Sequence, residues 1–123
     1  MYFSQLEKRA ILTFANAMIA ADGRVAADEF ISATLWFNTL GFSESDLKLD
    51  NLEPSQAMTV ISNLSYDEKR CVTSLLITIM IADKEIHPKE KALIDLITSF
   101  CNLPEMSAAD IQGTLEDLTN NVI

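Results

Sequence analysis

The sequence predicts an all-α protein: a seven-helix bundle with an internal duplication, in which three helices, one linking helix and three further helices follow one another. Apolar residues recur at spacings of three and four, and no segment alternates apolar and polar residues as a strand does. The chain also matches itself when shifted by 61 positions, the separation of Ser4 from Ser65. We expect one domain, 1–123, with repeat 1 at about 4–50, the linking helix at about 54–63 and repeat 2 at about 65–121.

Each repeat is expected to open with a long core helix. Ser4 with Glu7, and Ser65 with Glu68, have the spacing of a capping box, in which serine and glutamate satisfy each other's main-chain N–H groups. A run of twelve residues without charge follows each box, at 10–21 and 71–82. Two helices that are apolar nearly all round should pack against each other at the centre of the bundle.

The second helix of each repeat is amphipathic. In repeat 1 we expect it from Ala27 to Leu40, ended by Gly41, a residue that tolerates the left-handed conformation at helix ends. In repeat 2 it should cover Lys89–Phe100, with Pro88 at the first helical position and Asn102 as the matching stop.

Capping patterns predict the remaining helices. Ser43 with Asp46, and Ser107 with Asp110, should each cap a third helix. Pro54 suits the first turn of the linking helix between the repeats.

Charge and length exclude several classes of partner. The net charge is −9, from 18 acidic and 9 basic residues, so the surface should repel nucleic acid and anionic lipid. A membrane-spanning helix needs roughly 20 apolar residues, more than either charge-free run provides, so we expect no direct membrane insertion. Cys71 and Cys101 form no CxxC pair and no secretory signal is visible, which favours reduced thiols in a cytoplasmic protein.

One acidic turn occurs in both repeats. Asp22 and Glu29 in repeat 1 correspond to Asp83 and Glu90 in repeat 2. A repeated carboxylate pair is a candidate site for a divalent cation, Ca²⁺ or Mg²⁺, which bind through oxygen ligands. The alternative is structural: a glutamate near the third residue of a helix stabilises its positive N-terminus, and an aspartate accepts turn N–H groups.

Other sites are poorly supported. A calcium-binding EF-hand loop would need carboxylates where the chain has Met18 and Ala20, so a working loop of that type is rejected. Catalysis by a nucleophile and histidine would have to use His87, the single histidine, with Cys71 or Cys101. Both cysteines lie in apolar helices, where thiols are usually inert, so no catalytic residue is assigned and we expect no enzyme.

The repeated turn resembles a known family. The pattern A-D-G-x-V-x-x-x-E at 21–29, repeated as A-D-x-x-I-x-P-x-E at 82–90, is similar to that of the TerB-like (tellurite-resistance TerB) family. The resemblance implies a duplicated seven-helix fold and a cytoplasmic bacterial protein tied to tellurite or stress resistance. It also implies divalent-metal binding at four acidic positions: Asp22, Glu29, Asp83 and Glu90. The chain departs from the pattern at Lys84, where glycine is expected, and at Ala26, where serine or aspartate is usual.

The leading interpretation is therefore a TerB-like helical binding or interaction module, with a divalent cation as its candidate ligand and a protein as its candidate partner. The alternative is a structural or protein-interaction domain that binds no metal or small molecule. Trp36 and Phe37 are neighbours about 100° apart around their helix, so exposure of either would mark a partner surface. The oligomeric state is left open by the sequence.

Overall fold

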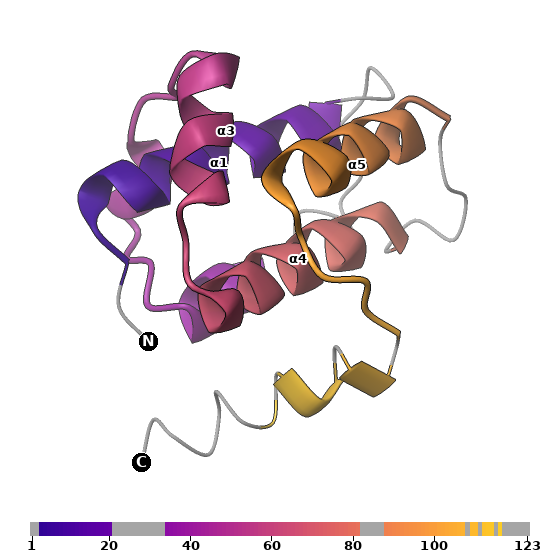
Figure 1. Cartoon of the computed structure of the whole chain (residues 1–123). Coiled ribbons are helices and arrows are strands. Elements are labelled where there is room, and N and C mark those ends of the chain that lie inside the picture. The colour runs from indigo at the N-terminus through magenta and orange to yellow at the C-terminus, as the bar shows by residue number, and fades with distance from the viewer. Residues whose placement is uncertain are drawn as a thin grey trace.

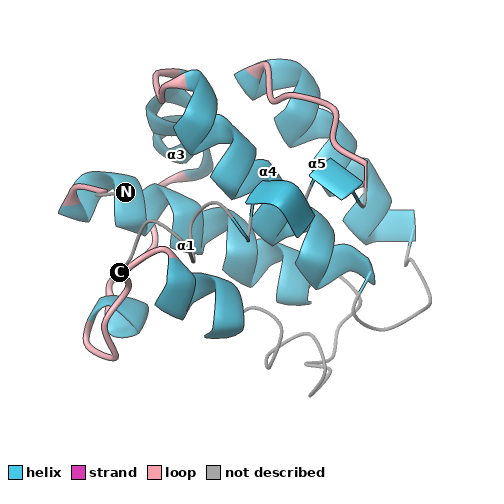
Figure 2. Cartoon of the chain, turned by 90° about the horizontal axis from the view of Figure 1, so that it is seen from below, coloured by secondary structure: helices cyan, strands magenta, loops and turns pink. Residues whose placement is uncertain are grey.

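The computed structural model describes residues 3–20, 34–81, 88–107, 109–110, 112–114 and 116. All regular structure in these ranges is helical, which confirms the predicted all-α class (Figure 2). The named elements are α1 (Gln5–Ala20), the 3₁₀ turn η1 (Asp46–Lys48), α3 (Pro54–Ser62), α4 (Tyr66–Ile81) and α5 (Pro88–Cys101). Residues 34–39 and the described residues from 109 onward are helical as well.

The two predicted core helices do pack against each other. Helix α1 contacts α4, and it also contacts α3 and α5, so it is in contact with every other named helix of the described fold. In Figure 1, α3 crosses α1, α5 lies above α4, and the C-terminal helical turns lie below α4. None of the helices within the described ranges is long and apolar enough to cross a membrane.

The core draws apolar side chains from all of these helices. The largest side chains that are almost fully buried are Trp36, Phe3, Ile11, Leu12, Met18, Leu40, Ile61, Leu75, Leu76, Ile79 and Ile97. A core of this composition needs no disulfide or metal to hold a domain of this size together.

Both predicted capping boxes are confirmed. The N–H of Ser4 donates to Glu7 Oε1 at 2.7 Å and the N–H of Glu7 donates to Ser4 Oγ at 3.2 Å. The Ser65 and Glu68 pair makes the same two bonds, at 2.9 and 3.2 Å. The helices that they open, α1 and α4, are each 16 residues long.

The predicted helix stops are confirmed too. Gly41 has φ +86° and Asn102 has φ +54°, the left-handed conformation expected at both positions. After each stop, a main-chain N–H donates to the carbonyl five residues earlier: Phe42 to Phe37 at 2.9 Å, and Leu103 to Thr98 at 3.0 Å. An asparagine replaces glycine at the second stop because it is among the residues that visit this conformation most readily.

Both side chains of the Trp36 and Phe37 pair are buried. Trp36 is 2% exposed and Phe37 is 6% exposed, so neither marks a partner surface. The reason lies in the turn after Gly41, which returns Phe42 to the helix. The Phe42 ring then packs on the Phe37 ring, with the centroids 5.2 Å apart, and covers the side of the helix that the sequence leaves open.

The third helix of repeat 1 is shorter than predicted. Ser43 and Asp46 form the expected capping bonds, at 2.8 and 3.2 Å, but only the 3₁₀ turn η1 follows. Leu49 is already extended, with φ −63° and ψ 146°, and the chain then runs to Pro54. In repeat 2, the Ser107 and Asp110 pair makes the same bonds, and the described residues after it are helical.

Asp46 also ties η1 to α1. Lys8 Nζ lies 2.8 Å from Asp46 Oδ2, and the two side chains are only 16% and 21% exposed. The same ammonium lies 5.6 Å from the centroid of the Phe42 ring. The hydrogen bond from Lys8, followed by the N–H of Ser43, holds the pKa of Asp46 below its ordinary value of 3.8.

We expect replacement of Lys8 by methionine to raise the pKa of Asp46 towards 3.8, measured by NMR titration of the carboxyl carbons. Asp110 is the matched control, because its pKa is lowered mainly by Ser107 and should stay where it is. Since the folded-state pKa of Asp46 lies below the unfolded one, its contribution to stability is present above about pH 4 and is lost as the pH falls through the folded value. An unchanged pKa of Asp46 in the variant would contradict this account.

Candidate functional site

The acidic turns lie almost wholly outside the described residues. Asp22, Glu29 and Asp83 belong to the ranges that are not described, so the structure does not test whether the four carboxylates converge. The backbone of Glu90 is described: it is the third residue of α5, which begins at Pro88 as predicted. A negative charge at that position is favoured by the helix dipole. Among the described residues, no three His, Cys, Asp or Glu side chains are grouped closely enough to hold a metal ion.

Both thiols are free and buried, as the sequence predicted. Burial raises the pKa of the Cys71 thiol to about 11 from an ordinary value of 9.0. Burial also raises the pKa of the Cys101 thiol. This thiol donates a hydrogen bond from Sγ to the carbonyl oxygen of Met58 at 3.5 Å. A thiol that stays protonated is a poor nucleophile and a poor metal ligand.

We expect neither cysteine to react with a disulfide reagent such as dithionitrobenzoate while the protein is folded. At pH 8, the Cys71 thiol, with a pKa of about 11, is only about 0.1% thiolate, so its reaction should be slower than in the denatured chain by a factor on the order of 100 or more. The raised pKa of the buried Cys101 thiol should slow its reaction as well. Absorbance of the released thiolate measures the rate, and the denatured chain serves as the control. A rapid reaction of one thiol in the folded chain would reveal a reactive cysteine that the structure does not account for.

The hydroxyl groups of the core helices make hydrogen bonds within their own helices, and Ser74 Oγ also lies 3.5 Å from Met106 Sδ. Thr13, Thr73, Ser74 and Thr78 each donate to the carbonyl four residues earlier, at 2.7 to 2.8 Å. This agrees with the prediction that such side chains bond the preceding turn. Asn16 behaves differently, because its Nδ2 donates to Oδ1 of Asn51 at 3.2 Å.

Thr13 has a second bond that fastens the linking segment to α1. Its Oγ1 accepts the main-chain N–H of Leu52 at 2.9 Å in a buried position. One turn earlier, Arg9 Nε donates to the carbonyl oxygen of Asp50 at 3.0 Å. These two bonds hold the chain on α1 just before α3 begins at Pro54.

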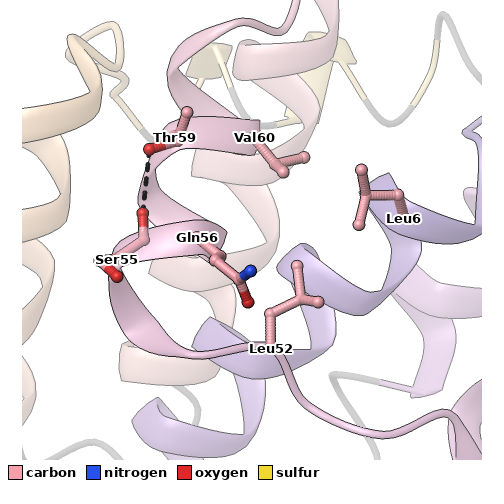
Figure 3. A pocket seen from close by; sticks show the side chains of 6 residues that line it. All are labelled: Leu6, Leu52, Ser55, Gln56, Thr59 and Val60. Carbon is pink, nitrogen blue, oxygen red and sulfur yellow. Dashed lines mark hydrogen bonds between the residues drawn. The ribbon is translucent and has the colours of Figure 1, made fainter.

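An open groove of about 340 Å³ lies where α3 crosses α1. Figure 3 shows Leu6 and Val60 on opposite sides of the groove, with Leu52 and Gln56 beside them. The lining residues are Leu6, Leu52, Ser55, Gln56, Thr59 and Val60, none of them charged. Leu6 is 51% exposed, so the groove presents apolar surface to solvent.

Sequence reasoning missed this groove. Leu6 lies in the capping turn of α1, and Val60 lies far along the chain in the linking helix. Leu6 and Val60 come close together only because of the way α3 crosses α1, and no local sequence pattern specifies that crossing. The one sequence signal for the groove is Leu6 itself, because it is an apolar residue on the solvent-facing side of a capped first turn.

Further apolar side chains are exposed away from the groove. Leu96 and Phe100 on α5 are 54% and 61% exposed, and Tyr66 is 66% exposed. Leu35, which the 61-residue shift places on Leu96, is 55% exposed. Clustered exposed apolar residues are typical of interaction surfaces, whereas single ones are ordinary.

Comparison with known proteins gives a likeness of structure but no function. No protein-family model matches the chain, and no curated protein sequence matches it either. The chain is similar to the crystal structure of a protein of unknown function from Porphyromonas gingivalis W83. The TM-score is 0.78 and the sequence identity 32%, over 94% of this chain and 92% of the other.

Proposed function

We propose that this chain, which belongs to one family with the Porphyromonas gingivalis protein of unknown function, is a TerB-like helical module that acts by binding rather than by catalysis. The observation that carries the proposal is the repetition of structural detail between the two halves. Helices α1 and α4 have the same length and the same capping box, and the helices after them end on left-handed residues followed by the same bond. This repetition supports the arrangement of three, one and three helices.

Further pairs of residues 61 positions apart behave alike. The Thr13 hydroxyl donates to the carbonyl of Arg9, and the Ser74 hydroxyl donates to the carbonyl of Arg70. Leu35 and Leu96 are 55% and 54% exposed. Likeness in polar contacts as well as in exposure supports a duplicated unit over a chance match of helix lengths.

Binding is favoured over catalysis by what the polar side chains do. The core hydroxyls are used in helix bonds, and the raised pKa values leave both thiols protonated near neutral pH. In the TerB-like interpretation, the ligand is a divalent cation at Asp22, Glu29, Asp83 and Glu90, in a cytoplasmic protein linked to stress or tellurite resistance. Oxygen ligands of this kind suit Ca²⁺ or Mg²⁺.

A titration of the metal-free chain with Ca²⁺ and then Mg²⁺, followed by amide NMR shifts, tests the cation. We expect saturable shifts at 22–29 and 83–90 that are lost when Asp22→Asn is combined with Glu29→Gln. The matched control combines Glu44→Gln with Asp50→Asn, which removes the same charge from exposed positions elsewhere. Shifts that are absent at several millimolar cation, or lost equally in both double variants, would contradict a cation site.

The alternative is a protein-interaction domain without a metal, and the groove between α1 and α3 favours it. In this case the turn carboxylates are structural, as the place of Glu90 in the first turn of α5 also suggests. A small neutral probe with an apolar end, such as isopropanol, should then give saturable shifts of the methyl groups of Leu6, Leu52 and Val60. The methyl groups of Leu35, exposed outside the groove, should respond only linearly; the same response at all four residues would argue against the groove.

A further inference from the structure

Repeat 2 contains three extra residues just before its last cap. The cap serines Ser43 and Ser107 are 64 positions apart, whereas the helix stops and the residues after them match at 61. The extra residues are therefore 104–106, and Met106 is the last of them. In Figure 1 the chain here runs from the end of α5 past α4 to the C-terminal helical turns.

In both repeats, an arginine of the core helix holds the chain that follows the cap. Arg9 Nε donates to the carbonyl oxygen of Asp50 at 3.0 Å, and Arg70 Nη2 donates to Thr114 Oγ1 at 3.1 Å. Asp50 and Thr114 each lie seven residues after their cap serine, so the two contacts correspond. In repeat 2 this contact ties α4 to the described residues between 106 and 114, called here the C-terminal segment.

The hydroxyl one turn further along each core helix makes a different contact in the two repeats. In repeat 1, Thr13 Oγ1 accepts the main-chain N–H of Leu52 at 2.9 Å. In repeat 2, Ser74 is 0% exposed and its Oγ lies 3.5 Å from Met106 Sδ. A thioether is a weak acceptor, and the single hydroxyl hydrogen of Ser74 also serves the shorter bond to the Arg70 carbonyl, at 2.8 Å. Repeat 2 thus has a sulfur contact where repeat 1 has a main-chain hydrogen bond.

We propose that Met106 is an oxidation site, and that its conversion to the sulfoxide by a peroxide releases the C-terminal segment from α4. The Met106 side chain is partly exposed, so a small oxidant can reach it from solvent. The sulfur lone pair attacks one peroxide oxygen, and the S–O bond forms as the O–O bond breaks. The sulfur is oxidised by two electrons, and the other oxygen of hydrogen peroxide leaves as water with both hydrogens.

The sulfoxide does not suit the contact that the thioether makes. Oxidation turns an apolar side chain into a strongly polar one. A sulfoxide oxygen facing Ser74 competes with the Arg70 carbonyl for one hydrogen, so one of the two buried acceptors is left without a donor. The oxidised side chain is therefore more stable in water than against α4. Neither Met106 nor Ser74 lines the groove or belongs to the acidic turns, so the inference does not rest on the proposed function.

Amide hydrogen exchange of the full chain, measured by NMR before and after treatment with millimolar hydrogen peroxide, tests the release. We expect exchange at Gly113 and Thr114 to rise at least about tenfold, whereas the Leu52 amide of repeat 1 stays within about twofold. Methionine sulfoxide reductases with dithiothreitol should restore the original rates. Mass spectrometry of peptic peptides identifies the oxidised methionines. A folded chain in which Met106 stays unoxidised, or unchanged exchange at Thr114 once Met106 is oxidised, would overturn the proposal.

Three variants assign the effect to this contact. Met106→Leu keeps the apolar bulk but forms no sulfoxide, so peroxide should leave exchange at Thr114 within about twofold. Met80→Leu is the matched control, because Met80 is also partly exposed and lies on α4, and it should respond as the native chain does. Ser74→Ala removes the hydroxyl and makes room for the added oxygen, so the rise should shrink to less than about threefold. A full rise in Met106→Leu or in Ser74→Ala would contradict the mechanism.

Discussion

Replacing Trp36 with alanine should destabilise the protein by about 3–5 kcal/mol, the range for removal of a large aromatic side chain from a packed core. Trp36 is 2% exposed and is the largest of the fully buried side chains. Its removal loses apolar contacts and leaves a cavity that the surrounding helices refill only in part. For a domain of this size the loss is a large share of the whole stability of about 5–15 kcal/mol.

The neighbouring residue supplies the control for Trp36→Ala. Leu35 is 55% exposed on the same helix, so Leu35→Ala should change the free energy of unfolding by no more than about 0.5–1 kcal/mol. Urea unfolding followed by far-UV circular dichroism measures both variants, since the tryptophan fluorescence is lost in one of them. Similar effects of the two substitutions would mean that the tryptophan does not have the buried place that the structure gives it.

The same tryptophan shows where sequence reasoning works and where it stops. Helix starts and stops could be predicted, because capping depends on residues within one turn of each other: Ser4 with Glu7 at a start, and Gly41 at a stop. Which face of a helix is covered depends on distant residues. Phe37 is buried by Phe42, and only the geometry of the intervening turn brings the two rings together.

Helix lengths were harder to predict than helix starts. Ser43 and Asp46 cap the chain as predicted, but η1 is only three residues long and ends at Lys48. The chain leaves the helix there because Leu49 and Leu52 pack inward, Leu49 partly and Leu52 almost fully, while Thr13 accepts the N–H of Leu52. That tertiary bond lies between residues 39 positions apart and has no local signal.

The candidate sites also differ in whether a local sequence pattern or the folded arrangement reveals them. The acidic turns were found by pattern alone, and the described residues hold only the backbone of Glu90 from them, so the cation remains a proposal. The groove and the exposed apolar side chains of α5 were not found from the sequence. Leu96 and Phe100 have the spacing of an ordinary amphipathic face, and only their exposure in the structure separates them from core residues of the same type such as Ile97.

Replacing Thr13 with valine should lower the free energy of unfolding by about 1–3 kcal/mol, the cost of leaving a buried donor without an acceptor. Valine keeps the shape of threonine but has no oxygen, so the N–H of Leu52 loses the 2.9 Å bond that it makes in the folded chain. Leu52 is 9% exposed, so little water can replace the hydroxyl. Chemical denaturation measures the effect, and hydrogen exchange of the Leu52 amide shows whether this contact is the one that weakens.

Thr73→Val in α4 is the matched control for Thr13→Val. Thr73 is buried and donates to the carbonyl of Lys69 as Thr13 donates to that of Arg9, but within the described contacts it accepts no main-chain N–H. Its loss should therefore cost less than about 1 kcal/mol. Because Leu52 lines the groove, Thr13→Val should also shift the methyl signals of Leu6 and Val60, whereas Thr73→Val should not. Equal stabilities of the two variants would show that the bond to Leu52 adds nothing beyond the helix bond that both threonines make.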